Sequence, residues 1–233
     1  MVVDAEPPAV LVLAFGGPER SEEIRPFLRR VLAGRPVPPE RFEEVAHHYE
    51  LIGGRSPLGE ITREQTGLLT GRLGIDAGRV RIGTRHSEPF IEDALRELAS
   101  AGCTEAVGLI LAAHESPASH GRYREAVERA REVIGAGAPH VRYAREFHTH
   151  PGFVAAHAEH IRTAITELPE ASRDAAPLIF TAHSIPTAVA ERSPYVEQLT
   201  RSAELVRAAL DDDRPTRIAY QSRSGSPRDP WLE

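Results

Sequence analysis

The sequence predicts an α/β protein made of two consecutive units, each with a parallel sheet flanked by helices, the second unit incomplete. Short, continuous apolar runs alternate along the whole chain with amphipathic stretches of about 10 to 15 residues. Strands that are apolar on both faces are typical of a parallel sheet covered by helices on both sides. We expect the first unit over 1–146 and the second over 147–233.

The first unit begins with a predicted strand at 11–15, Leu-Val-Leu-Ala-Phe, which stops at Gly16-Gly17-Pro18. Ser21-Glu22-Glu23 then opens an amphipathic helix that reaches Leu32. The same alternation predicts the other elements of this unit, which therefore has four strands. These elements are helices at about 40–49, 60–73, 88–101 and 119–134, and strands at about 79–83, 105–112 and 140–144.

The second unit begins with a helix from Pro151 to about residue 167, preceded by His150 in place of a strong cap. A strand at 178–182, a helix at 195–210 and a strand at 217–221 follow. With only two strands, the sheet has an unfilled edge, and we expect Trp231 to have little to pack against. Because uncovered strands promote association, we also expect this chain to self-associate.

Composition and charge exclude several classes of function. The net charge of −6 argues against a nucleic-acid surface, which needs clustered basic residues. The sequence contains no apolar run long enough for an integral membrane segment and no signal-peptide pattern at its start, so we expect a cytoplasmic protein. All 28 basic residues are arginine, which excludes lysine chemistry. One cysteine, Cys103, cannot hold an iron–sulfur cluster, so none is expected.

Histidines follow three of the predicted strands, at the sheet edge where open parallel folds bind ligands. They are His86, His114 and His183. By residue type alone, each fits a loop-capping role as well as a functional one. A histidine near neutral pKa can accept a proton or bind a metal, which makes these positions candidates for a site.

Other histidine patterns are weaker. His148 with His150, and His157 with His160, have spacings compatible with chelation, but exposed positions explain them better. The motifs H-E-x-x-H, G-x-S-x-G and G-x-G-x-x-G are absent, which argues against zinc protease, serine hydrolase and dinucleotide-binding activities.

Six ordered stretches of the chain resemble the ferrochelatases, which insert ferrous iron into a porphyrin. They are LVLAFGGPE, HHYELIGGRSPLGEIT, GTRHSEPFIEDAL, FHTHPGF, LIFTAHSIP and AYQSRSGSPRDPWLE. The likeness covers nearly the whole chain and is strongest to the actinobacterial branch. It implies two Rossmann-like chelatase units, a role in haem biosynthesis, ferrous iron as a substrate, and coproporphyrin III or protoporphyrin IX as the porphyrin.

The resemblance also implies roles for individual residues. His183, in the AHSIP motif, matches the histidine that binds the incoming metal or accepts a pyrrole proton. Phe15 matches the position beneath the macrocycle, where a phenylalanine cannot ligate iron. Polar side chains at the edge of an apolar slot would bind the porphyrin carboxylates. The expected substrate-binding residues are Phe15, Tyr49, Arg55, Ser56, His86, Tyr123 and Ile185, and the arginines expected to attract the anionic porphyrin are Arg29, Arg30, Arg55 and Arg85.

The family also carries a glutamate opposite this histidine, in a later segment that the sequence lacks. We expect a fragment of low activity or a short relative, in which Glu115 or His114 would take the glutamate's role. Two other functions stay open, a noncatalytic tetrapyrrole-binding protein and a cobalt or nickel chelatase that uses His86 or His114 as a second histidine. The porphyrin, the metal and the oligomeric state are also open at this point.

Overall fold

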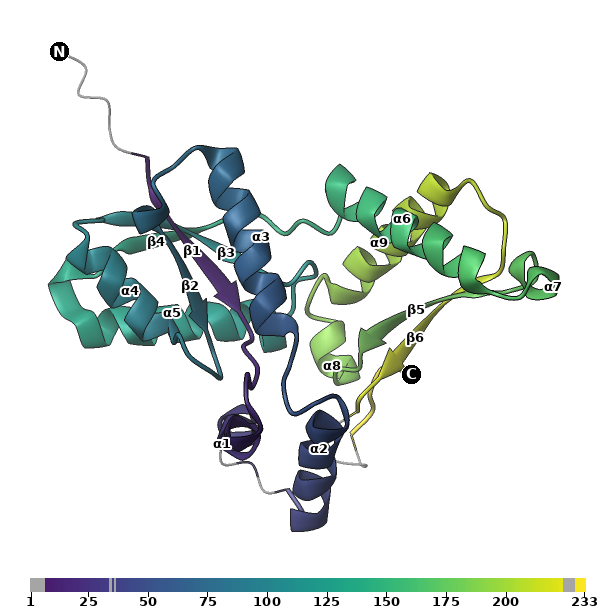
Figure 1. Ribbon diagram of the computed structural model, residues 1–233, viewed down its shortest axis with the longest axis horizontal. Helices are drawn as coiled ribbons and strands as arrows, with labels where there is room; N and C mark the ends of the chain where they lie inside the picture. The colour runs from purple at the N-terminus through teal and green to yellow at the C-terminus, as the bar shows by residue number, and fades with distance from the viewer. Residues whose placement is uncertain (1–6, 34, 36, 224–228) are drawn as a thin grey trace. The chain divides into compact units, whose positions relative to one another are not determined.

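The structure is a computed structural model that describes residues 7–33, 35, 37–223 and 229–233. The chain forms two compact units, Met1–Leu111 with Arg122–Arg145, and Ala112–Gly121 with Glu146–Glu233. Each unit contains a parallel sheet and helices, so the α/β class expected from the alternating pattern is confirmed (Figure 1). The domains 1–146 and 147–233 stay a prediction, because compactness does not show that either part folds alone.

The first unit has a four-stranded sheet with the predicted number of strands. Its order is β2-β1-β3-β4, and every pair is parallel. All six residues of β1 are buried, because this strand has a neighbour on each side and helical cover on both faces. The strands are β1 (Ala9–Ala14), β2 (Val80–Thr84), β3 (Glu105–Ile110) and β4 (His140–Tyr143).

Helices cover both faces of this sheet. On one face Leu69 of α3 packs with Val10, Val12 and Val80. On the other, a side chain on Gly83 would lie 2.9 Å from the backbone of Ile91, so glycine lets α4 approach β2 closely. The helices of this unit are α1 (Ile24–Leu32), α2 (Pro39–Leu51), α3 (Leu58–Leu73), α4 (Ile91–Ser100) and α5 (Arg122–Ile134), with 3-10 turns at Ser21–Glu23, Ala77–Arg79 and Gly135–Gly137.

Two helix starts differ from the sequence prediction. The helix expected at 88–101 begins at Ile91, because the Thr84 N–H donates to the Pro89 carbonyl at 2.8 Å and residues 85–90 form a loop. The helix expected at 119–134 begins with a π-helical turn, Pro117–Gly121, that precedes α5.

The second unit contains a two-stranded parallel sheet and two long helices that pack together, α6 and α9. The elements are α6 (Pro151–Glu167), α7 (Glu170–Arg173), β5 (Leu178–His183), α8 (Thr187–Ala190), α9 (Tyr195–Leu210) and β6 (Thr216–Gln221). The sequence pattern missed α7 and α8, since four residues are too few to show helical periodicity. Within β5, exposed and less exposed residues alternate, and Ile179 is 59% exposed.

His150 is an effective helix cap, contrary to the sequence interpretation. Its Nδ1 accepts a hydrogen bond of 3.1 Å from the Gly152 N–H, which would otherwise have no partner at the start of α6.

The expectation that Trp231 has little to pack against is wrong. Trp231 is half-buried and forms an isolated antiparallel bridge with Pro186. The next residue, Leu232, donates its N–H to the Ile185 carbonyl at 3.1 Å. The described end of the chain, residues 229–233, therefore lies along the loop that follows β5.

Two observations on the described residues concern membrane-spanning helices and the single cysteine. No helix among them is both long and apolar enough to cross a membrane. Cys103 is buried and takes no part in a disulfide.

Candidate functional site

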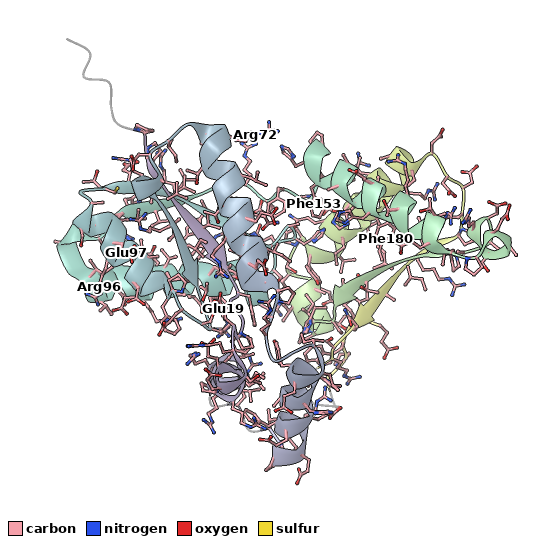
Figure 2. All side chains as sticks on the ribbon, in the orientation of Figure 1. Glu19, Arg72, Arg96, Glu97, Phe153 and Phe180 are labelled. Carbon is pink, nitrogen blue, oxygen red and sulfur yellow. The ribbon has the colours of Figure 1, made fainter. Side chains whose placement is uncertain are left out.

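The structure distributes the predicted site residues between the two units. Unit 1 contains the predicted aromatic and edge residues together with His86, and unit 2 contains His183 and Ile185. Figure 2 shows the described side chains of both units as sticks on the ribbon.

Four rings in unit 1 form an aromatic cluster of Phe15, Phe27, Tyr49 and His86. The centroid of Phe15 lies 4.6 Å from that of His86 and 6.1 Å from that of Phe27. Phe27 also meets Tyr49 edge-on at 5.9 Å. Phe27 and His86 are buried, whereas Phe15 is 39% exposed. The cluster therefore presents one partly exposed phenylalanine ring on a packed aromatic base.

His86 is held by its backbone rather than by its ring. Its N–H donates to the Phe15 carbonyl at 3.2 Å, and its carbonyl accepts a 2.7 Å bond from Arg30 Nε. Burial, followed by the nearby positive charges of Arg85, Arg30 and Arg35, lowers the pKa of His86 to about 4. The imidazole is thus uncharged at neutral pH and acts as a polar ring within the cluster.

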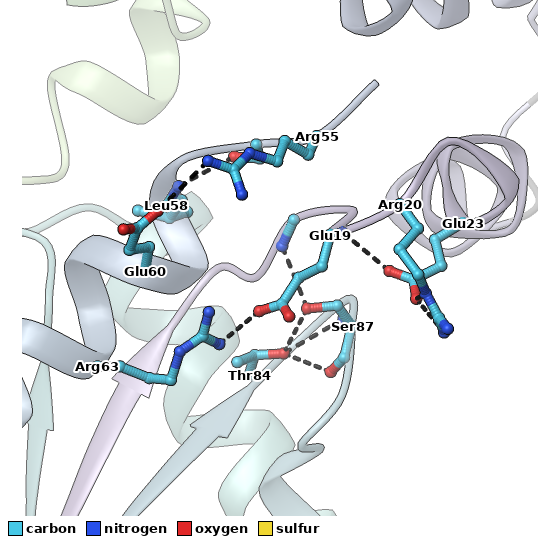
Figure 3. A network of polar contacts seen from close by, with 11 residues as sticks. Glu19, Arg20, Glu23, Arg55, Leu58, Glu60, Arg63, Thr84 and Ser87 are labelled. Atoms are coloured by element: carbon cyan, nitrogen blue, oxygen red, sulfur yellow. Dashed lines mark hydrogen bonds and ion pairs between the residues drawn. The ribbon is translucent and has the colours of Figure 1, made fainter. Parts of the chain in front are cut away.

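The loop that carries Phe15 is locked to the loop after β2. The Gly17 N–H donates to Ser87 Oγ at 3.1 Å, and Thr84 Oγ1 donates to the Ser87 carbonyl at 2.5 Å (Figure 3). Gly16 has φ of +87°, and a side chain there would collide with Thr84 and Ser87. The glycine pair that ends the first strand therefore holds Phe15 beside His86.

Arg85 and Tyr123 form a second feature of unit 1. The Arg85 guanidinium carbon lies 5.3 Å from the Tyr123 ring centroid. Tyr123 is 4% exposed, and this burial raises its pKa to about 12. Burial also lowers the pKa of Arg85, and no salt bridge to its guanidinium occurs among the described residues. An arginine in this state favours an anionic ligand such as a carboxylate.

The remaining edge residues differ in availability. The Tyr49 hydroxyl has no hydrogen-bond partner in the described part of the chain, and burial raises its pKa. Ser56 has a local role, because its Oγ accepts from the Leu58 N–H at 3.3 Å and its N–H donates to the Pro18 carbonyl at 2.7 Å. Arg55 is exposed and pairs with Glu60 at 3.6 Å (Figure 3). Tyr49 is therefore the freest of the three to bind a ligand.

His183 of unit 2 is the last residue of β5, and its side chain is exposed. Its carbonyl accepts a 3.0 Å bond from the Tyr195 hydroxyl. Ile185 is 5% exposed, and its role as a wall of the porphyrin site stays a prediction. An exposed imidazole offers a nitrogen lone pair to a proton or a metal ion.

A further histidine group in unit 2 escaped the sequence prediction. His114 Nε2 lies 2.9 Å from Ser202 Oγ, which in turn donates to the His148 carbonyl at 2.9 Å. Burial, then the charges of His148, His157 and His120, lowers the pKa of His114 to about 4. No local pattern indicates a contact between residues 88 positions apart in the sequence.

Two histidines of the candidate chelating pairs make other contacts. His150 caps α6, and the exposed His157 ring packs against Phe153, with centroids 4.5 Å apart. Phe153 is labelled on α6 in Figure 2. Within the described residues, no three His, Cys, Asp or Glu side chains are placed to hold a metal ion together. Of the three histidines predicted to follow strands, His183 is exposed, His114 is partly buried and His86 is buried.

Comparisons with known proteins indicate which family the chain resembles. The Ferrochelatase family model matches residues 7–233. A coproporphyrin III ferrochelatase of Nocardia farcinica is 41% identical over 239 residues, covering 97% of this chain and 66% of that protein. One from Mycobacterium ulcerans is 40% identical (97% and 65%), and a ferrochelatase of Rhodopirellula baltica is 39% identical (96% and 64%). The chain therefore spans slightly less than two thirds of the length of these relatives.

Proposed function

We propose that this chain, which belongs to the ferrochelatase family, takes part in the insertion of ferrous iron into a porphyrin in haem synthesis. The observation that carries the proposal is the match over 97% of the chain to proteins named coproporphyrin III ferrochelatase. Those names favour coproporphyrin III over protoporphyrin IX as the substrate. The cytoplasmic location expected from the sequence is part of the same proposal.

The first unit would bind the porphyrin. A flat, apolar macrocycle is complementary to the partly exposed Phe15 ring on its aromatic base. The porphyrin carboxylates are anions, and Arg85 is a half-buried cation without a salt-bridge partner among the described residues. The Tyr49 hydroxyl would supply a hydrogen bond at the edge of the ring. Porphyrin binding thus depends on residues that the fold of unit 1 already brings together.

His183 would act on the protons and the metal. Each ferrous ion that enters the macrocycle replaces two pyrrole protons, which leave one after the other. A neutral imidazole nitrogen can accept such a proton and pass it to water, or bind the ferrous ion briefly before insertion. His86 is a poorer base at neutral pH, since its pKa is about 4. We therefore assign the catalytic role to the exposed His183.

The test compares His183→Ala with His160→Ala, which removes an exposed histidine on α6. Ferrous iron insertion into coproporphyrin III is measured without oxygen, and porphyrin binding is measured by fluorescence. We expect His183→Ala to lower the insertion rate by about a hundredfold or more, the usual value of a proton-transfer group, and to change binding by less than about threefold. His160→Ala should match the parent chain. Insertion by His183→Ala at close to the parent rate would refute the assignment.

A further inference from the structure

The loop directly after His183 makes hydrogen bonds with β6, with α9 and with the described end of the chain. In β5 the residue pairs with Gln221 of β6, and the next N–H, of Ser184, donates to the Gln221 carbonyl at 2.7 Å. The Tyr195 hydroxyl, at the start of α9, donates to the His183 carbonyl at 3.0 Å. Two separate elements therefore fix the peptide group that joins His183 to Ser184.

The described end of the chain adds a third set of contacts to the same loop. Ser184 Oγ donates to the Leu232 carbonyl at 2.7 Å, and the Leu232 N–H donates to the Ile185 carbonyl at 3.1 Å. The Thr187 N–H donates to the Pro230 carbonyl at 3.0 Å. Ser184 is 1% exposed. The segment Pro230–Leu232 is thus bound across the loop by both backbone and side-chain hydrogen bonds.

This arrangement matters because the His183 ring has no hydrogen-bond partner of its own among the described residues, so its place depends on the backbone. A two-stranded sheet gives weak support by itself, and strand ends fray. A catalytic imidazole works only when it is held close to its productive position, and a misplacement of about 1 Å is costly. The loop contacts supply the support that the small sheet does not.

We propose that Ser184 and Tyr195 are positioning residues for His183, and that Pro230–Leu232 is the strap against which Ser184 holds the loop. The inference rests on the proposed function, in which His183 acts on the proton or the metal. Ser184 acts through its hydroxyl, which ties the residue after His183 to the strap. Tyr195 acts through the His183 carbonyl.

The experiment measures the mobility of His183 directly and turnover separately. The variants are Ser184→Ala and Tyr195→Phe, each of which removes one hydroxyl. Tyr143→Phe in β4 of unit 1 is the matched control, since its buried hydroxyl has no hydrogen-bond partner within the described residues. NMR relaxation of the ring Cε1–H of ¹³C-labelled histidine, assigned with His183→Gln, reports the order of the imidazole. Steady-state metal insertion into coproporphyrin III gives kcat and KM, and circular dichroism verifies folding.

We expect both variants to lower the order parameter of the His183 ring and to lower kcat by about tenfold, with KM for the porphyrin within about twofold, while Tyr143→Phe changes neither. An unchanged ring order parameter overturns the proposal, whether or not turnover changes. A lower order parameter with full kcat overturns it too, because the position of the ring then does not matter. If His183→Gln itself keeps full turnover, the proposed function fails instead, and the relaxation data still decide whether these residues hold the ring.

Discussion

The strands of the two sheets differ in how deeply they are buried. All of β1 is buried, because it lies between two strands and under helices on both faces. In β5, which pairs with β6 alone among the described residues, exposure alternates and Ile179 is 59% exposed. Similar apolar sequences, Leu-Val-Leu-Ala and Leu-Ile-Phe-Thr, thus reach different burial. Neighbouring strands and helical layers decide how much an apolar strand contributes to stability.

Two histidines near strand ends, His86 and His183, also differ in burial. His86 of unit 1 is 8% exposed and packs against Phe15 and Phe27, and its pKa is about 4. His183 of unit 2 is exposed, and its backbone rather than its ring is held. In the proposed function, the buried ring of His86 belongs to the porphyrin-binding surface and the exposed ring of His183 transfers the proton.

The largest expected difference lies in core substitutions. Leu13 in β1 is fully buried, so Leu13→Ala should lower the free energy of unfolding by about 2 to 5 kcal/mol. Ile179→Ala should change it by less than about 0.5 kcal/mol, the usual range for an exposed position. Hydrogen exchange of the β1 and β5 amides measures each effect locally. Equal losses for the two variants would show that the sheets do not differ as described.

The next effect is the pH dependence of stability through His86. Its pKa is lowered from 6.5 in the unfolded chain to about 4 in the folded one, so the unfolded chain takes the proton first. Stability is therefore full above about pH 6.5 and falls by about 1.4 kcal/mol per pH unit as the pH drops toward 4. Between pH 7 and pH 5 the loss is about 2 kcal/mol.

Urea unfolding of the parent chain and of His86→Phe, measured at pH 7 and pH 5, isolates this contribution. We expect His86→Phe to lose less stability on acidification, because phenylalanine keeps a ring in the cluster without a titrating group. His160→Phe is the exposed control and should behave as the parent does. A parent and His86→Phe that lose the same amount would mean that His86 titrates normally in the folded protein.

A smaller effect concerns the porphyrin edge. Tyr49→Phe should weaken coproporphyrin III binding by about 1 kcal/mol, the usual net value of one hydrogen bond, without affecting unfolding. Ser56→Ala removes an expected contact with the porphyrin and also the hydrogen bond from the Leu58 N–H. This variant should therefore weaken porphyrin binding and lower the free energy of unfolding together. Fluorescence titration and urea unfolding of both variants test this difference. Unchanged binding by Tyr49→Phe would remove Tyr49 from the proposed binding residues.

The smallest effect is electrostatic attraction of the porphyrin. The chain carries a net charge of −6, so an anionic porphyrin needs local positive charge to approach. Arg85→Gln should slow association more than Arg55→Gln, because Arg55 is exposed and already paired with Glu60. Stopped-flow association should slow as salt rises, since charges are screened over about 10 Å at 0.1 M. An association rate that is independent of salt would remove this role from the arginines.

Local patterns in the sequence determined most of the secondary structure and the positions of the candidate histidines. Every predicted strand is present, because a short apolar run bounded by glycine or proline depends on neighbouring residues only. The same reasoning placed His86 after the second strand, where the structure has it, and His183 directly after the strand at 178–182, although β5 extends by one residue to include it. The roles of these residues came from the family resemblance and from the chemistry of imidazole, and they remain proposals.

Only the tertiary structure decided which side chains meet. The bond from His114 to Ser202, the strap from Pro230 to Leu232 on the His183 loop, and the Phe15–His86 contact join residues far apart in the chain. Such contacts depend on the path of the backbone and on which faces are covered, neither of which a local pattern contains. The same holds for burial, which made Ile185 an interior residue and left His183 exposed. Residue types indicate what chemistry is available, and packing decides where it is accessible.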